Sequence, residues 1–293
     1  MPHLFYSLND ARYNNYIYYQ IQFMKKVYLL ALLVLFACGL SYAQTISATA
    51  STKDSVFVCP PCGGCDYVSY DKAGKCPVCG MTLIKMSLSD FQKQISLKPI
   101  TVNFYIQDQV ELLDFAGPME VFAAAGFRIN TVSKTKDPIH SNALSFTPKY
   151  DIKDAPPADV LVVFGGSYTN TINDTAVMAW IRGQRNTTPY FMSVCTGAYI
   201  LGKAGILDGM TATTYFLSID SLQKALPKTK VLSNTRFVDN GNVITTAGIS
   251  AGIDGALHLV EKLRGRAYAK SIAQTIEYDK WVPDDGLVLN KGN

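Results

Sequence analysis

DVLVVFGG at residues 159–166 and PYFMSVCTGAYILGKAGILDG at residues 189–209 set the architecture of this chain. The first segment is a continuous apolar run closed by two glycines, which is the composition of a parallel strand buried on both faces. The second segment starts with a similar run and then changes to helical spacing, so it predicts a strand that leads directly into a helix ended by Gly209. A strand followed at once by a helix is the repeating unit of an α/β sheet.

The flanking sequence continues this alternation in both directions. Short β-rich runs alternate with segments whose apolar residues recur at helical spacing. Because parallel strands need crossover helices, the order predicts one α/β domain with helices on both faces of its sheet, over residues 100–284. The expected strands are residues 101–106 and 128–133, and the expected helices are residues 110–126, 247–265 and 267–281.

Composition places the chain among ordinary folded proteins. It has 293 residues, of which 48% are hydrophobic, 17% charged and 11% aromatic, and this excludes disordered, collagenous and coiled-coil classes. A net charge of +4 is too small to indicate a nucleic-acid surface. We therefore expect no nucleic-acid partner.

An export signal is expected near the amino terminus. MKK at residues 24–26 precedes an apolar stretch at residues 27–40, and SYA at residues 41–43 supplies a small-x-small cleavage site. This pattern predicts a signal peptide cleaved before Gln44 and a protein exported to the periplasm. Residues 1–43 are then a mis-started prefix plus the signal peptide, with translation expected to begin at the methionine of MKK.

Two alternatives to a cleaved signal peptide stay open. A permanent anchor would need about 20 apolar residues, which is more than residues 27–40 offer, so no membrane span is expected. LFAC at residues 35–38 resembles the lipobox of bacterial lipoproteins, which would attach a lipid anchor at Cys38, although Phe36 fits that pattern poorly.

A cysteine-rich segment follows a small polar linker at residues 44–55. Residues 56–86 contain two copies of C-P-x-C-G, a turn in which proline and glycine let two thiolates point at one centre. Two such turns supply four sulfur ligands for a tetrahedral ion. The predicted structural site for zinc or another soft metal consists of Cys59, Cys62, Cys76 and Cys79, with Cys65 as an alternative ligand.

A disulfide-linked loop is the competing interpretation of this segment, since an exported compartment would allow disulfides. Five cysteines is an odd number, and two cysteines of one C-x-x-C turn make an awkward disulfide, so the pattern favours metal.

Cys195 stands at the predicted junction of a strand and a helix. In open parallel sheets, chemistry concentrates where strands end, and Gly165 and Gly166 mark a second strand end. Small residues after Cys195 permit a sharp turn that exposes a nucleophile, and the start of a helix favours a thiolate. The competing interpretation is an inert packing cysteine.

Four blocks together resemble the DJ-1/PfpI superfamily, in particular the branch that contains isonitrile hydratase and the amidase-like domains of AraC-type regulators. The resemblance covers nearly all of residues 100–284 and implies a flavodoxin-like, doubly wound, mostly parallel sheet. GKCPVCGM at residues 74–81 resembles a bacterial heavy-metal-binding domain, although cysteines replace a histidine of that pattern. The four blocks are residues 112–122, 159–166, 193–216 and 245–263.

The resemblance assigns roles to particular residues. It implies that Cys195 is a nucleophile, that Asp114 is its acid/base partner, and that Thr196 assists. For Asp114 the alternative is an acid that only starts a helix, and Glu120 is expected to be a solvated or capping group. The glycine amides implied to form an oxyanion or substrate pocket are those of Gly165, Gly166 and Gly197.

One departure from the family pattern concerns the usual histidine. Many relatives read A-T-T-H-W where this chain has Tyr215 after two threonines. His3 lies in the prefix, His140 in an expected hairpin, and His258 between leucines on an expected helix, so none of them replaces it. Peptidase chemistry is weakened, because it depends on a cysteine–histidine pair, whereas chemistry based on Asp114 and Cys195 survives.

Two function classes follow from these residues. The first is an exported enzyme that hydrates or hydrolyses a small electrophilic molecule. The second is a redox or ligand sensor, or a metal-linked binding protein, that performs no turnover. A transcription regulator is disfavoured by the export signal and by the lack of a recognisable helix-turn-helix segment. Relatives are often dimers, so a homodimer is compatible with this sequence.

Overall fold

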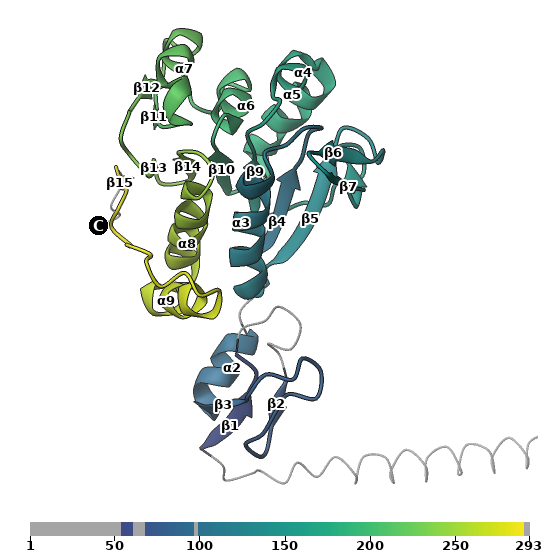
Figure 1. The fold of residues 1–293 in the computed structure, drawn as a ribbon, viewed down its shortest axis with the longest axis vertical. Coiled ribbons are helices and arrows are strands. Elements are labelled where there is room, and N and C mark those ends of the chain that lie inside the picture. Colours follow the sequence, from purple (N-terminus) through teal and green to yellow (C-terminus); the bar gives the residue numbers. More distant parts are fainter. Residues whose placement is uncertain (1–53, 61–67, 97–98, 290–293) are drawn as a thin grey trace, which may run out of the picture. The chain divides into compact units, whose positions relative to one another are not determined.

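A computed structural model of the chain describes residues 54–60, 68–96 and 99–289 (Figure 1). Three predicted features lie outside the described residues: the signal peptide, the lipobox Cys38, and two cysteines of the cysteine-rich segment, Cys62 and Cys65. The described chain contains a small cysteine ribbon and a larger α/β domain. In the described segments no helix has the length and apolar character needed to cross a membrane.

The ribbon is a three-stranded antiparallel sheet with one helix. Its strands follow the order β2-β1-β3, and Phe57 at the centre pairs with Tyr70 on one side and Lys85 on the other. Ser87 precedes the helix, and its hydroxyl accepts a hydrogen bond from the amide of Asp90 at 3.0 Å, as expected of a helix N-cap. The elements are β1 (Ser55–Val58), β2 (Ser69–Tyr70), β3 (Ile84–Ser87) and α2 (Leu88–Ser96).

A mostly parallel eight-stranded sheet forms the centre of the α/β domain, as the sequence predicts. Its order is β15-β13-β14-β10-β9-β4-β5-β8, and of these neighbours only β13 and β14 are antiparallel. The strands are β4 (Thr101–Tyr105), β5 (Arg128–Ser133), β8 (Tyr150–Asp151), β9 (Val160–Val163), β10 (Tyr190–Val194), β13 (Phe237–Asp239), β14 (Val243–Thr246) and β15 (Leu287–Val288).

Helices cover both faces of this sheet because its central strands are apolar on both sides (Figure 1). One apolar cluster packs under α3 (Leu112–Ala124), α8 (Ala251–Arg264) and α9 (Arg266–Thr275). The cluster on the other face packs under α5 (Thr175–Gly183), α6 (Gly197–Lys203) and α7 (Ile219–Ala225).

Shorter elements complete the domain. A hairpin joins β6 (Ile139–Ser141) to β7 (Leu144–Phe146), and β11 (Thr211–Ala212) pairs with β12 (Lys230–Val231). The remaining short helices are α4 (Thr169–Asn173), η1 (Gln184–Asn186) and η2 (Phe216–Ser218).

The helix that follows Cys195 is shorter than the sequence predicts. We call the sharp turn at Cys195, between β10 and this helix, the elbow. We expected the helix to end at Gly209, but α6 ends at Lys203. Gly205 adopts φ +77°, a left-handed conformation that glycine reaches without strain. The amide of Ile206 then bonds to the carbonyl of Leu201 at 3.0 Å, so a Schellman-type turn terminates the helix before the second glycine.

The chain reverses its direction of winding at β4. From β4 it proceeds outward to β5 and β8, and it then returns to the opposite side of β4 to form β9 and β10. Connections leave the carboxyl ends of β4 and β9 in different directions, which opens a crevice at this edge of the sheet. Cys195 and a cavity described below both lie along this edge.

Candidate functional site

Cys195 occupies a strained turn between β10 and α6. Its φ is +58°, which is uncommon for a residue other than glycine. Two hydrogen bonds hold the turn: the amide of Cys195 donates to the carbonyl of Ala247 at 3.1 Å, and the hydroxyl of Thr214 donates to the carbonyl of Cys195 at 2.8 Å. The side chain of Cys195 is only 5% exposed.

Gly165 is the point at which the three residues assigned to catalysis meet. A Cβ at this position would lie 2.6 Å from Oδ2 of Asp114, 2.8 Å from Cβ of Cys195 and 2.9 Å from Oγ1 of Thr196. A side chain at residue 165 would therefore separate the acid from the elbow. Gly197 has a related role, because a Cβ there would lie 2.6 Å from the carbonyl oxygen of Val163 and would push α6 away from β9.

Asp114 is fully buried in the first turn of α3. Its Oδ2 accepts a hydrogen bond from the amide of Gly165 at 3.1 Å, and its Oδ1 accepts one from the amide of Ile249 at 2.8 Å. Its carboxyl group also hydrogen-bonds the side chain of Cys195. These contacts show a positioned acid, and the simple helix-starting role does not account for them.

Burial shifts both members of this pair toward their protonated forms. It raises the pKa of Asp114 to about 6. Burial, followed by the negative charge of Asp114, raises the pKa of Cys195 to about 12, although the amide and hydroxyl of Thr196 act in the opposite direction. Burial therefore opposes the ionised sulfur that the start of a helix was expected to favour.

The three glycines implied to form an oxyanion pocket are not equivalent. The amide of Gly165 already donates to Asp114, so it is occupied. Gly166 is exposed with φ +98°, and Gly197 is the first residue of α6. Neither of these two amides has an acceptor within the described chain, so they are the glycine donors that a bound oxyanion could use.

Tyr215 borders the same site as Cys195. A Cβ at Gly248 would lie 2.7 Å from Cδ2 of Tyr215 and 3.0 Å from Sγ of Cys195. The tyrosine ring and the sulfur thus face one small space that only glycine leaves open. The sequence did not identify Gly248, Ile249 and Thr214 as site residues. All three lie within the segments at residues 193–216 and 245–263 that carry the family resemblance.

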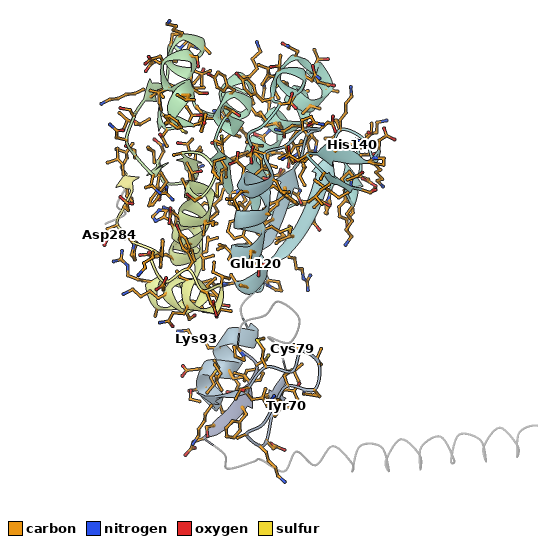
Figure 2. All side chains as sticks on the ribbon, viewed as in Figure 1. Tyr70, Cys79, Lys93, Glu120, His140 and Asp284 are labelled. Carbon is orange, nitrogen blue, oxygen red and sulfur yellow. The ribbon has the colours of Figure 1, made fainter. Side chains whose placement is uncertain are left out.

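The described histidines and Glu120 lie elsewhere. Nδ1 of His140 is 3.5 Å from Oδ1 of Asp108 in the exposed part of the β6–β7 hairpin. Nε2 of His258 is 2.9 Å from Oδ2 of the buried Asp239, which is a structural pairing. Glu120 is exposed on α3 (Figure 2), as expected for a solvated group.

A second candidate site lies in the ribbon. The sulfur atoms of Cys59, Cys76 and Cys79 lie within 4.8 Å of one another, and four thiolates around zinc would be about 3.8 Å apart for Zn–S bonds of about 2.3 Å. The backbone amide of Cys79 is the main cause that lowers the pKa of Cys76 to about 6. Three thiols at this spacing, one of them with a lowered pKa, fit a soft metal, with a fourth ligand expected from outside the described residues.

The alternative of a disulfide within this cluster does not fit the coordinates. Sγ of Cys59 and Sγ of Cys79 are 3.2 Å apart, whereas a disulfide bond requires about 2.05 Å. The side chain of Cys79 is exposed (Figure 2), while Cys59 and Cys76 are buried beside Leu83. Met81 packs against this cluster as an apolar cap.

Comparison with known families decides the class of this protein. Residues 100–262, more than half of the chain, match the DJ-1/PfpI family. The chain belongs to the DJ-1/PfpI family. Residues 56–86 of this DJ-1/PfpI protein also match the heavy metal binding domain, which agrees with the sulfur cluster.

Several relatives of this DJ-1/PfpI protein are informative. Isonitrile hydratase of Pseudomonas putida is 35% identical over 191 residues, which cover 64% of this chain and 82% of that enzyme. The HTH-type transcriptional regulator GbdR of Pseudomonas aeruginosa is 25% identical over 62% of this chain but only 52% of the regulator, so the chain spans about half of that relative. The crystal structure of a ThiJ/PfpI family protein from Pseudomonas syringae superimposes with a TM-score of 0.59 at 30% identity, over 64% of this chain and 78% of that one.

Proposed function

We propose that this protein is an exported hydratase-type enzyme that adds water to a small electrophilic molecule, with isonitriles as the favoured class. The observation that carries the proposal is the meeting of Asp114, Cys195 and Thr196 over Gly165. The 35% identity to an isonitrile hydratase supports the substrate class. Asp114 serves as acid and base, and Cys195 serves as nucleophile.

The raised pKa of Cys195 means that its proton must leave as the sulfur attacks. Asp114 takes this proton while a bond forms between sulfur and the isonitrile carbon, and it returns the proton to that carbon to give a thioimidate. Water then adds to the carbon–nitrogen double bond, so carbon gains a hydroxyl and nitrogen gains a hydrogen. The carbon–sulfur bond breaks, the hydroxyl proton returns to sulfur through Asp114, and an N-substituted formamide leaves without any redox change.

Other groups around the elbow have supporting roles in this scheme. The amides of Gly166 and Gly197 are positioned near the elbow as hydrogen-bond donors for charge that develops on the substrate. Thr196 hydrogen-bonds the sulfur, which helps to stabilise it when it loses its proton. Tyr215 borders the sulfur and would close one side of the substrate space, in place of the histidine that many relatives carry there.

Turnover of benzyl isonitrile by the purified full chain tests the proposal. We expect formation of N-benzylformamide by the wild type and its loss in Cys195→Ala and in Asp114→Asn. Asp208→Asn is the matched control, because Asp208 is an exposed carboxylate that pairs with Lys228. Equal rates for the wild type and Cys195→Ala would reject nucleophilic catalysis by this sulfur.

A binding role without turnover is the second candidate. It is favoured by Tyr215 at the position of the usual histidine and by the related regulators. Burial of Cys195, which raises its pKa, argues against a redox sensor, because the thiolate is the form that peroxide oxidises. Saturable binding of an isonitrile with no product formation would favour this second role.

The ribbon completes the proposal. We assign to it a structural zinc or another soft metal held by Cys59, Cys76 and Cys79, with Cys62 as the fourth ligand and Cys65 as an alternative ligand in the set. Bound metal would cross-link the ribbon strands and would take no part in the reaction.

Export to the periplasm is the localisation that we propose, on the basis of the signal pattern at residues 24–43. The competing form is a lipoprotein anchored at Cys38.

A further inference from the structure

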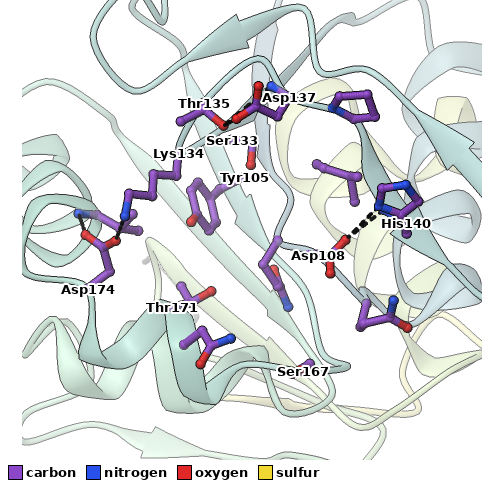
Figure 3. A pocket seen from close by; sticks show the side chains of 16 residues that line it. Tyr105, Asp108, Ser133, Lys134, Thr135, Asp137, His140, Ser167, Thr171 and Asp174 are labelled. Atoms are coloured by element: carbon purple, nitrogen blue, oxygen red, sulfur yellow. Dashed lines mark hydrogen bonds and ion pairs between the residues drawn. The ribbon is translucent and has the colours of Figure 1, made fainter.

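A cavity of about 510 Å³ lies at the carboxyl edge of the sheet, beside the proposed reaction site and separate from it. It is bordered by the ends of β4 and β5, by the residues that follow β9, and by the start of α5 (Figure 3). Asp114, Cys195 and Thr196 do not line it. Its volume is in the range of sites that enclose a small molecule, and its place beside β4 is the crevice at which α/β sheets bind ligands.

The charged groups around this cavity have an excess of carboxylates. Three aspartates line it, whereas Lys134 and His140 are its basic side chains. Nζ of Lys134 is 2.5 Å from Oδ2 of Asp174 (Figure 3). Oδ1 of Asp174 also accepts hydrogen bonds from the amides of Ala176 and Val177 at the start of α5. The charge of Asp174 is therefore compensated within the protein.

The other two carboxylates are less fully compensated. Asp137 accepts a hydrogen bond from the hydroxyl of Thr135 at 2.7 Å, which supplies a dipole and no charge. Asp108 accepts from the backbone amide of His140 at 2.8 Å, and the imidazole of His140 lies 3.5 Å from the same oxygen (Figure 3). Among the described residues, neither Asp108 nor Asp137 forms an ion pair with a lysine or an arginine.

A buried amide fixes one wall of the cavity. Gln107 is 5% exposed and lines the cavity. Its Nε2 donates to the carbonyls of Phe164 and Gly165 at 2.9 and 3.0 Å, which fixes the orientation of the amide. Its Oε1 has no hydrogen-bond partner in the described chain and is shielded from solvent. Gln107 therefore gives the cavity a fixed wall.

We propose that this cavity binds a small organic molecule that carries an ammonium group. The carboxylates of Asp108 and Asp137 supply the attraction, and small polar side chains such as Ser133 and Ser167 supply adaptable hydrogen bonds. This site does not depend on turnover at Cys195. It is connected to that residue's neighbourhood, because Gln107 bonds to the carbonyl of Gly165 and the amide of Gly165 bonds to Asp114.

Isothermal titration calorimetry of the full chain with three probes of equal length tests the proposal. Cadaverine carries two ammonium groups, 5-amino-1-pentanol carries one, and 1,5-pentanediol carries none. We expect saturable binding in that order of affinity, with added salt weakening the binding of cadaverine most. Equal affinity for the diol and the diamine, or no saturable binding by either amine, would overturn the proposal.

Variants then place the binding in this cavity. Asp108→Asn and Asp137→Asn should each weaken cadaverine binding about three- to fivefold, as expected for the loss of one partly solvated charge partner. Asp208→Asn removes an exposed carboxylate that does not line the cavity and should leave the affinity unchanged. Unchanged affinity in the Asp108→Asn/Asp137→Asn double variant, with an unaltered circular dichroism melting curve, would show that the amines bind elsewhere.

Discussion

The backbone amide of Ile249 donates a hydrogen bond of 2.8 Å to Oδ1 of Asp114, a residue 135 positions earlier in the chain. Ile249 adopts φ +58° to make this bond, a conformation that is strained for a β-branched side chain. The amide of Gly165 holds the other carboxylate oxygen. Two loops from distant parts of the sequence therefore orient the acid beside Cys195, and each of these bonds lowers the pKa of Asp114 against the larger effect of burial.

The rate of isonitrile hydration should rise with pH as Asp114 ionises. Asp114 must be a carboxylate to accept the thiol proton, and its pKa is about 6, so kcat/KM should increase through that pH and level off above it. Asp114→Asn should reduce kcat/KM by about 10²- to 10⁴-fold and abolish this limb of the profile. If the rise of kcat/KM with pH persisted in Asp114→Asn, another group would have to be responsible for it.

Asp114 should also make the stability of the protein depend on pH. Its pKa in the folded protein, about 6, is above the ordinary value of 3.8, so its contribution to stability is greatest below the lower value and is lost as pH rises through the higher one. Between about pH 4 and pH 7.5, the free energy of unfolding of the wild type should fall relative to Asp114→Asn by roughly 2.4 kcal/mol. Urea denaturation at both pH values measures this change, and a constant difference between the two proteins would contradict the assignment.

Cys195 should react slowly with alkylating agents despite its place at the elbow. The thiolate is the reactive form, and the pKa of Cys195 is raised to about 12 while its side chain is buried. Brief treatment of the metal-free protein with iodoacetamide, followed by peptide mass mapping, should label the exposed Cys79 before Cys195. Labelling of Cys195 at a rate comparable to that of Cys79 would contradict the raised pKa and would favour the ionised sulfur that the sequence suggested.

The ribbon should bind about one metal ion per chain. Titration with Co²⁺ should produce the intense thiolate-to-metal absorption of a sulfur-rich tetrahedral site, and added Zn²⁺ should displace it. Cys76→Ser and Cys79→Ser should weaken this signal, whereas Cys195→Ser, far along the sequence in the α/β domain, should leave it unchanged. An equal signal in the wild type and in the Cys76→Ser/Cys79→Ser double variant would place the metal elsewhere.

The mature amino terminus should begin at Gln44. Expression in a Gram-negative host, followed by fractionation and intact-mass measurement of the periplasmic protein, would reveal this cleavage site. Cys38→Ala should leave the mature mass unchanged. A mature chain that begins at Cys38 with added lipid mass, and that is lost in Cys38→Ala, would instead identify a lipoprotein.

Much of the fold was predictable because local patterns carry it. The apolar runs that became β9 and β10, the helical spacing of α3 and α8, and the alternation that makes the sheet parallel are properties of neighbouring residues. The position of Cys195 at a strand–helix junction was evident for the same reason. The end of α6 was misjudged because two glycines compete for that role, and only the turn closed by Leu201 and Ile206 selects the first of them.

The state of the candidate site could not be inferred from neighbouring residues. Protonation of Cys195 depends on burial beside Asp114, and orientation of Asp114 depends on amides at residues 165 and 249, all of which come together only when the sheet closes. The order of residues thus specified which chemical groups the protein possesses and which elements carry them. Folding determined their ionisation and their partners, because desolvation and hydrogen bonding act through space between segments that are remote along the chain.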